Sequence, residues 1–288
     1  MKSISLLSPA KLNLFLKVIN KRPDGYHNLI TLFERIDLCD EITVTLNPGS
    51  RIHISCDHPE VPVGTKNLVY RATRLLKEKL TIAQGVNIRI KKKIPVAAGL
   101  GGGSSNAAAV LLGLNRLWRL SLNRQELVNF GKLIGSDVPF FLYDCSWAVG
   151  TQRGDVIQNV PLKTKLWQIL VVPRIKVYSR EVFTRLRLPP KMQLTKKMAD
   201  VNMVPALRKN DLSYVGKLLS NDLESTVTQL HPNIIKLKNK LRSLKTLGVC
   251  LSGSGPAVFG LTDSQQHAEE LRTHLAKTYK QVFAVRTL

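Results

Sequence analysis

Apolar and polar residues alternate in the first segment of the chain. Every second residue from Ala10 to Val18 is apolar, and Lys11 and Asn13 fall between them. This period of two predicts a β-strand with one face packed inward. Lys11 and Asn13 then share the opposite face, away from the apolar core. The tripeptide at 23–25, Pro-Asp-Gly, predicts a turn after the strand.

Strand and helix patterns follow one another along the rest of the chain. Apolar spacing predicts helices near 67–80, 107–118, 124–133, 212–223, 234–244 and 264–277, and strands near 30–38, 41–46, 86–94, 166–173 and 281–288 and on both sides of 251–256. This mixture predicts an α+β fold with two lobes. Glycine and polar residues cluster at 150–155, so we expect domains at 1–155 and 156–288.

The composition is that of a globular protein, with 44% hydrophobic residues among 288. No stretch approaches the ~20 consecutive apolar residues of a membrane helix. The apolar run at the start is broken by Pro9, Lys11 and Asn13, which does not fit a secretory leader. We therefore expect a cytoplasmic protein without a membrane partner. The four cysteines lack the spacing of a zinc site or a disulfide framework.

The net charge of +23 raises the question of a nucleic-acid partner. The basic residues are spread along the chain, and the only tight run is at 91–93. Aromatic residues make up 6% and do not alternate with basic ones, as a platform for stacking single-stranded bases would require. The pattern favours a solvated basic surface that attracts polyanionic small molecules, and nucleic acid is the less favoured partner.

A glycine-rich loop between a predicted strand and a predicted helix carries the clearest chemistry. Gly99 is followed by three consecutive glycines at 101–103, and Ser104, Ser105 and Asn106 are suitable residues for a helix N-cap. Backbone N–H groups and the helix dipole make such a place an anion site, so the loop is predicted to bind a di- or triphosphate. The sequence lacks a Walker A motif, a Gly-x-Gly-x-x-Gly motif and protein-kinase motifs.

The string at 95–108, PVAAGLGGGSSNAA, resembles the ATP-binding signature of the GHMP kinases, a family of small-molecule kinases. The resemblance extends over nearly the whole chain and implies a two-lobed fold, with an N-terminal ATP-binding lobe and a C-terminal α/β sandwich lobe. It implies that Asn67 lies on the adenine side of the nucleotide. The residues implied to bind ATP with it are Pro95, Val96, Ala97, Ala98, Gly99, Leu100, Gly101, Gly102, Gly103, Ser104 and Ser105.

Two further segments resemble the catalytic motifs of that family. SPAKLNLFLKV places Lys11 where the family has an active-site lysine, and GSDVPFF places Asp137 where it has a catalytic aspartate. Asp137 is the candidate general base, oriented by Lys11, which would also offset negative charge during transfer. Mg²⁺ would bridge ATP oxygens, and the hydroxyl of Ser104 or Ser105 could reach it, with no choice between the two.

The string RPDGYHNL indicates the substrate. In this family Pro-Asp-Gly-Tyr-His is typical of members that phosphorylate a cytidine diphosphate derivative. The resemblance implies ATP-dependent phosphorylation of the 2-hydroxyl of 4-diphosphocytidyl-2-C-methyl-D-erythritol in isoprenoid precursor synthesis. Tyr26 would stack on the cytosine and His27 would hydrogen-bond its edge. Asn13 would also contact the substrate, and Phe183 or Tyr178 would complete the stack.

Two alternatives stay open from the sequence. One is a GHMP kinase for another small alcohol, such as mevalonate or homoserine. The other is a basic nucleic-acid-binding protein on the same fold. LSGSGPAVFG matches a third family motif and is expected to close against the glycine-rich loop, whereas NDLE, at 221–224, matches without an assigned role. GTQRGD departs from the shorter family pattern Gly-x-Gly-Glu. We expect a monomer or a weak homodimer.

Overall fold

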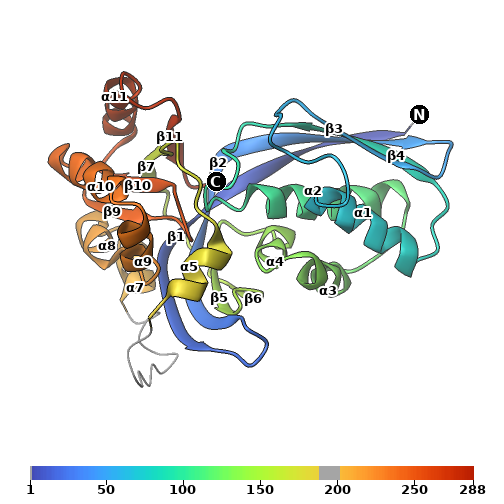
Figure 1. The fold of residues 1–288 in the computed structure, drawn as a ribbon, viewed down its shortest axis with the longest axis horizontal. Helices are drawn as coiled ribbons and strands as arrows, with labels where there is room; N and C mark the ends of the chain where they lie inside the picture. The colour runs from blue at the N-terminus through green and yellow to red at the C-terminus, as the bar shows by residue number, and fades with distance from the viewer. Residues whose placement is uncertain (1, 188–201) are drawn as a thin grey trace. The chain divides into compact units, whose positions relative to one another are not determined.

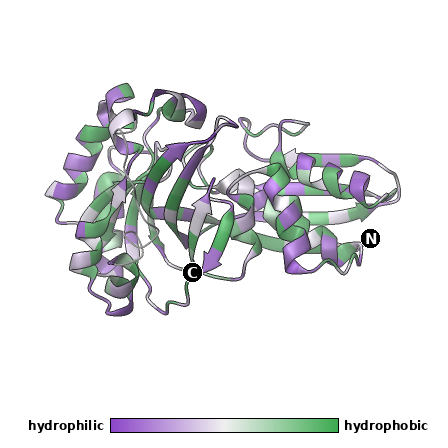
Figure 2. Cartoon of the chain, turned by 90° about the horizontal axis from the view of Figure 1, so that it is seen from below, coloured by the Kyte–Doolittle hydropathy of each residue, from purple (hydrophilic) through white to green (hydrophobic). Residues whose placement is uncertain are grey.

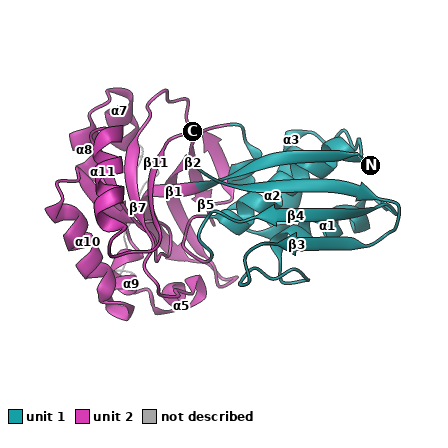
Figure 3. Cartoon of the chain, turned by 90° about the horizontal axis from the view of Figure 1, so that it is seen from above, with its two compact units in different colours: residues 1–10, 38–96, 101–144 teal, residues 11–37, 97–100, 145–288 magenta. Residues whose placement is uncertain are grey.

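The computed structural model describes residues 2–187 and 202–288, and the chain forms two compact units (Figure 3). Unit 1 contains Met1–Ala10, Leu38–Val96 and Gly101–Asp144, and unit 2 contains Lys11–Asp37, Ala97–Leu100 and Cys145–Leu288. The division falls within the two longest strands, β1 (Ser3–Lys21) and β2 (His27–Asn47). The units are therefore not contiguous ranges, and the family domains at 1–155 and 156–288 stay a prediction.

Unit 1 combines the start of β1, up to Ala10, and the end of β2, from Leu38, with two further strands and four helices (Figure 1). β2 pairs antiparallel with β4, and β4 pairs parallel with β3. Its other elements are β3 (Ile52–Cys56), β4 (Gly85–Lys91), α1 (Leu68–Lys79), α2 (Gly102–Leu117), α3 (Arg124–Ile134) and α4 (Val138–Leu142). α2 lies close to the sheet, because a Cβ at Gly113 would come within 2.8 Å of Leu6.

Unit 2 contains the end of β1, from Lys11, and the start of β2, up to Asp37. It also contains a separate four-stranded sheet in the order β11-β7-β10-β9. β2 pairs with β5, β5 pairs with β6, and β8 pairs parallel with β1. The strands are β5 (Trp147–Gln152), β6 (Val156–Asn159), β7 (Trp167–Val171), β8 (Ser220–Asn221), β9 (Gly248–Leu251), β10 (Val258–Thr262) and β11 (Val282–Arg286). The helices are α5 (Ser179–Arg185), α7 (Met203–Arg208), α8 (Leu212–Leu218), α9 (Glu224–Leu230), α10 (Asn233–Ser243) and α11 (Gln265–Leu275).

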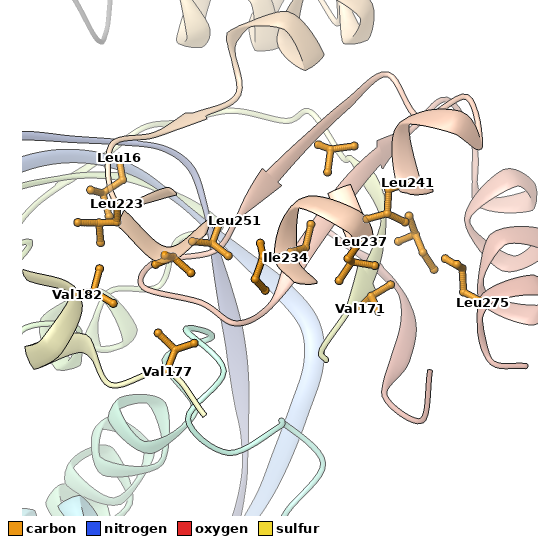
Figure 4. Packing of buried hydrophobic residues seen from close by; sticks show 14 of the residues in the cluster. Leu16, Val171, Val177, Val182, Leu223, Ile234, Leu237, Leu241, Leu251 and Leu275 are labelled. Carbon is orange, nitrogen blue, oxygen red and sulfur yellow. The ribbon is translucent and has the colours of Figure 1, made fainter. Parts of the chain in front are cut away.

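One apolar cluster fills the interior of unit 2 and joins strands to helices (Figure 4). Leu16 from β1 packs in it with Leu251 from β9 and Leu237 from α10. The helices carry both apolar and polar residues along their length (Figure 2), as expected for helices with one face on a sheet. Burial of these side chains, at about 1.5–3 kcal/mol each, fixes β1 against the elements that follow it.

Most predicted elements are present, and each difference has a physical cause. The predicted strands at 30–38 and 41–46 are one continuous strand, β2. The predicted helix at 212–223 ends at Leu218, because the next residues form β8 beside β1. The cluster of glycine and polar residues at 150–155 lies in the β5–β6 hairpin. The apolar run after Asp137 is a helix, α4, with proline in its first turn, a position that tolerates proline well.

Candidate active site

Lys11 and Asn13 lie together in unit 2, on the face of β1 that the alternation predicts. The Nζ of Lys11 donates to the Oδ1 of Asn13 at 2.6 Å, and the Nδ2 of Asn13 donates to the Oγ1 of Thr31 at 2.7 Å. Lys11 is only 3% exposed and Asn13 only 2%. A buried ammonium group is costly unless it is hydrogen-bonded. The chain therefore fixes this lysine in a defined position.

The third family motif closes against the glycine-rich loop within unit 2, which confirms that part of the prediction. The Oγ of Ser252 donates to the carbonyl of Gly99 at 3.1 Å, and the backbone N–H of Ala257 donates to the carbonyl of Ala98 at 3.2 Å. Lys11 joins the same arrangement, because its backbone N–H donates to the carbonyl of Leu100 at 3.0 Å.

Two glycines allow this close approach. Gly99 has φ +79°, and a Cβ there would lie 2.2 Å from the carbonyl oxygen of Ser252. Gly253 has φ +54°, and a Cβ there would lie 3.2 Å from the carbonyl oxygen of Gly99 and 3.3 Å from the Nζ of Lys11. Only glycine adopts such backbone angles without strain and leaves this space. The loop that contains Gly253 therefore lies directly on the lysine.

The second half of the glycine-rich loop begins α2 in unit 1. The helix starts at Gly102 with Gly101 as N-cap, so the predicted start near residue 107 is corrected by five residues. Ser104 and Ser105 lie inside the first turn, and their side chains do not cap the helix. Ser105 is 1% exposed and accepts a hydrogen bond from the Oγ of Ser8 at 2.8 Å. The first-turn N–H groups have no intrahelical acceptor, which leaves backbone donors for an anion.

A buried carboxylate that the sequence analysis missed supports this loop. Asp40 in unit 1 is fully buried and pairs with the Nζ of Lys92 at 2.5 Å. Its Oδ1 accepts the backbone N–H groups of Lys93 and Ile94, both at 2.8 Å. Its Oδ2 accepts the Nδ2 of Asn106 at 2.8 Å. Asp40 thus connects the segment that enters the loop with the helix that leaves it.

The predicted basic run at 91–93 is paired with carboxylates in unit 1. Lys92 reaches Asp40, as described above, and its side chain is 5% exposed. Lys91 and Lys93 both reach Glu41, at 3.5 and 2.7 Å. The run is therefore largely neutralised by side chains of the same unit.

Asp137 lies in unit 1 immediately before α4. It occupies the N-cap position with φ −84°, yet its side chain makes no capping hydrogen bond to the helix. The carboxylate is half-buried. The side chain therefore does not act as the helix cap, and the catalytic role of Asp137 stays a prediction.

His27 and Phe183 are brought together in unit 2. Their rings stack with centroids 5.2 Å apart and an interplanar angle of 28°. Burial and then the nearby Lys21 lower the pKa of His27 from its ordinary value, so the neutral imidazole is favoured, with one donor and one acceptor. Tyr178, the competing aromatic, is 63% exposed at the N-cap of α5. The arrangement favours Phe183.

Tyr26, the predicted cytosine platform, is 53% exposed in the turn between β1 and β2. The guanidinium of Arg153 lies 5.2 Å from the centroid of its ring. Arg153 is itself paired with Asp155, whose Oδ2 accepts from Nη2 at 2.6 Å. Sequence reasoning used the segment containing these two residues as a domain boundary and noted its departure from the family pattern, but it assigned neither residue a role. A cation on one face of the ring restrains it.

Asn67 has a structural role in unit 1. Its Oδ1 accepts the backbone N–H of Val69 at 2.8 Å, and its Nδ2 donates to the carbonyl of Pro62 at 2.5 Å. The side chain is thus the N-cap of α1. These bonds account for the residue without a nucleotide, and the adenine-side role stays a prediction.

Neither a metal cluster nor a membrane helix was found in the described part of the chain. Residues 2–187 and 202–288 contain no group of three or more His, Cys, Asp or Glu side chains arranged to hold a metal ion. No helix within those residues is long and apolar enough to cross a bilayer.

Comparison with known proteins identifies related sequences and folds. Family models for the GHMP kinases N terminal domain and the GHMP kinases C terminal match residues 67–145 and 203–281. The chain is 41% identical to 4-diphosphocytidyl-2-C-methyl-D-erythritol kinase of Bacillus velezensis, with 98% of this chain and 96% of the relative covered. It is also 41% identical to the enzyme of that name from Geobacillus kaustophilus, with 99% and 97% covered.

Solved structures give the same result for the fold. A crystal structure of 4-(cytidine 5'-diphospho)-2C-methyl-D-erythritol kinase is 31% identical, with a TM-score of 0.82, and 99% of this chain and 100% of that chain are covered. A homoserine kinase from Cytophaga hutchinsonii is 22% identical with a TM-score of 0.74, covering 100% and 95%. The latter likeness shows the fold alone.

Proposed function

Because the chain belongs to the 4-diphosphocytidyl-2-C-methyl-D-erythritol kinases of the GHMP kinase family, we propose that it phosphorylates the substrate in that name. The γ-phosphate of ATP passes to the 2-hydroxyl of 4-diphosphocytidyl-2-C-methyl-D-erythritol, giving the 2-phosphate and ADP, in the non-mevalonate route to isoprenoid precursors. The observation that carries this proposal is the 41% identity across 98% of the chain. The stacked pair His27–Phe183, with the exposed Tyr26 preceding His27 in the chain, also supports it.

ATP is the phosphate donor, and we place its phosphates at the glycine-rich loop. The first turn of α2 offers backbone N–H groups without intrahelical acceptors, and its dipole favours negative charge. Asp40 keeps both ends of this segment in place through Ile94 and Asn106. The ATP-binding residues predicted from the sequence, Asn67 and 95–105, include this turn.

In the reaction, Asp137 accepts the proton of the 2-hydroxyl while the hydroxyl oxygen bonds to the γ-phosphorus and ADP leaves. Phosphoryl transfer needs positioning and charge neutralisation more than covalent help from the protein. Lys11 supplies a fixed positive charge, because its Nζ is held by Asn13 at 2.6 Å. Such a preorganised charge stabilises the transition state without moving during the reaction.

The proposal includes Mg²⁺, which would be held mainly by ATP oxygens and by one serine hydroxyl of the first turn of α2. Ser105 is committed to Ser8, whereas Ser104 in the same turn is half-buried, so we assign the protein ligand to the hydroxyl of Ser104. When bound, the ion would neutralise phosphate charge.

The cytosine of the substrate is proposed to bind at the turn between β1 and β2. Tyr26 presents an exposed ring for stacking, and the neutral imidazole of His27 can pair with the polar edge of the base. Phe183 stacks on His27 and would be the second aromatic residue that contacts the cytosine. A cytoplasmic location and a monomer or weak homodimer remain predictions from the sequence.

A coupled assay of ADP release tests this function. The purified chain with ATP and Mg²⁺ is given the cytidyl substrate, with mevalonate and homoserine as parallel substrates. We expect turnover with the cytidyl substrate only. The turnover rate of Asp137→Asn should fall about 10²- to 10⁴-fold, which is the usual effect of removing a positioned base. Its melting temperature should stay near that of the wild type. Equal turnover with mevalonate or homoserine would overturn the substrate assignment.

Tyr26→Ala separates substrate recognition from chemistry. Base stacking on an aromatic ring contributes about 1–3 kcal/mol, so the cytidyl KM should rise roughly 5- to 150-fold. The ATP KM should stay unchanged. An increase in the ATP KM alone would reverse our placement of the two nucleotides.

A further inference from the structure

The NDLE segment, which matched the family without an assigned role, makes a set of buried hydrogen bonds in unit 2. We propose that Asn221 is a positioning residue for phosphoryl transfer. Its carboxamide fixes the loop at 251–255 on the Lys11–Asn13 pair, and this role rests on the kinase function proposed above. Asn221 does not touch substrate in this proposal. It acts through the loop on the lysine.

The carboxamide of Asn221 is fully used. Its Nδ2 donates to the carbonyl of Leu251 at 2.9 Å and to that of Gly253 at 2.7 Å, and its Oδ1 accepts the backbone N–H of Leu223 at 3.0 Å. The residue is 8% exposed. Two carbonyl acceptors require an NH₂ group at this place, and a backbone N–H requires an oxygen. Among side chains of this size, only a carboxamide satisfies all three contacts.

Asn221 is also attached to the strand that carries the active-site lysine. It belongs to β8, which pairs parallel with β1 in the register Leu16 opposite Asn221. The next residue, Asp222, strengthens this attachment. Its backbone N–H donates to the carbonyl of Leu16 at 2.9 Å, and its Oδ2 accepts the backbone N–H of Val18, also at 2.9 Å.

The loop that Asn221 holds lies directly on the lysine. A Cβ at Gly253 would come within 3.3 Å of the Nζ of Lys11 and 3.4 Å of the Oδ1 of Asn13. Gly253 is also one of the two residues whose carbonyl Asn221 binds. Asn221 therefore connects β1, through the backbone pairing of β8, with the loop that covers Lys11, through its carboxamide.

Glu224 completes the support of this loop. Its Oε2 accepts the backbone N–H of Leu251 at 3.3 Å, and its Oε1 accepts a hydrogen bond from Lys238. Leu251 is thus bound by its carbonyl to Asn221 and by its N–H to Glu224. The NDLE segment thus holds the third family motif, LSGSGPAVFG, in place.

Loss of the carboxamide should impair the chemical step more than substrate binding. Without it, two buried carbonyls lose their donor and the loop can move away from Lys11. A small misplacement of a catalytic group can cost up to about 10²-fold in rate. We expect Asn221→Ala to lower kcat by about 10- to 100-fold and to leave the KM values for ATP and the cytidyl substrate within about threefold. Asn221→Asp should be at least as severe, because a carboxylate oxygen would face two carbonyls.

Asn115→Ala is the matched control. Asn115 in unit 1 also binds one backbone segment with both ends of its carboxamide, the carbonyl and the N–H of Leu122, at 2.9 and 3.0 Å. It should lower the melting temperature without lowering kcat beyond about threefold. If Asn221→Ala is unfolded at the assay temperature, Asn221→Ser, which retains one donor, is measured in its place. A kcat within about threefold of wild type for the folded variant overturns the proposal.

A double-mutant cycle with Lys11→Met tests whether Asn221 acts through the lysine. In the Lys11→Met background, Asn221→Ala should change the residual turnover by less than about threefold. The same fold loss in both backgrounds would mean that Asn221 acts independently of Lys11 and would refute the positioning role. Failure of the proposed function would appear separately, as a wild-type chain that does not turn over the cytidyl substrate.

Discussion

Strand β2 carries two fully buried carboxylates, Glu34 in unit 2 and Asp40 in unit 1, which solve the same physical problem differently. Asp40 pairs with the ammonium of Lys92 and accepts two backbone N–H groups. Within the described residues, the side-chain donors to Glu34 are neutral ones, the Nε2 of Gln168 at 2.8 Å and the Oγ1 of Thr287 at 2.6 Å.

The difference has a direct electrostatic consequence. Burial raises the pKa of Glu34 to about 7, and the bonds from Thr287 and Gln168 oppose this shift only in part. Neutral donors therefore do not replace the hydration that a buried carboxylate loses. Asp40, in contrast, has a cation beside it, the ammonium of Lys92.

The largest effect is expected for Asp40→Ala. The change leaves the buried ammonium of Lys92 without its carboxylate and two backbone N–H groups without their acceptor. Breaking a buried pair from one side costs about 3–5 kcal/mol, so the free energy of unfolding in urea at pH 7 should fall by that amount. Glu41→Ala is the control, because Glu41 pairs with Lys91 and Lys93 at exposed positions and should cost less than about 1 kcal/mol. Equal losses in the two variants would remove the contrast.

Glu34→Gln should change how stability depends on pH. The folded-state pKa of Glu34, about 7, lies above its ordinary value of 4.5, so the folded chain holds a proton that the unfolded chain releases. This contribution is complete below about pH 4.5 and is lost as the pH rises to 7, amounting to about 3 kcal/mol. Between pH 5 and pH 8 the wild type should lose this stability and Glu34→Gln should not. Urea titrations of both proteins at both pH values measure the difference. The same change in the free energy of unfolding for the two proteins would contradict the assignment.

Asn106→Ala should have a smaller effect than Asp40→Ala. It removes the hydrogen bonds from Nδ2 to Asp40 and to Ser8, both at 2.8 Å, but leaves the ion pair with Lys92 intact. We expect a loss of about 1–3 kcal/mol in the free energy of unfolding. We also expect weaker ATP binding in calorimetry, because the first turn of α2 loses its link to Asp40. A loss as large as that of Asp40→Ala would show that the amide, rather than the cation, dominates the network.

Thr287→Val should have the smallest effect. The hydroxyl favours the charged form of Glu34, so its removal should raise the pKa of Glu34 further, and the pH midpoint of stability should move upward by less than about one unit. The overall cost is about 1 kcal/mol, partly because Oγ1 also accepts the backbone N–H of Leu166. Thr262→Val, whose hydroxyl donates to the carbonyl of Trp167, should leave the midpoint unchanged. A downward shift in Thr287→Val would contradict this account.

The sequence predicted the elements whose apolar spacing is set by their own residues. The alternation in β1 and the spacing in α1 and α3 are local properties, and these elements are present. The break between α8 and α9 is not local. It depends on the pairing of Asn221 with Leu16, which lies more than 200 residues earlier in the chain, and periodicity contains no information about such pairing.

The candidate site shows the same limit. The glycine-rich loop could be found because its residues are contiguous. Asp40 was missed and Asn221 was left without a role because their partners are far away, with Asp40 and Asn106 separated by 66 positions and Asn221 and Leu251 by 30. The alternation placed Lys11 and Asn13 on one face, but it could not show that other residues would bury both to 3% exposure or less.

The pairing of the basic run at 91–93 has a consequence for the binding of polyanions. Three lysines with two carboxylates, Asp40 and Glu41, amount to one net positive charge rather than three. Binding to a nucleic acid gains free energy by releasing one condensed counterion for each phosphate that is neutralised. With one net positive charge, this run would therefore release about one counterion on binding a nucleic acid. A search that reads such triplets as nucleic-acid signatures would overestimate its contribution threefold.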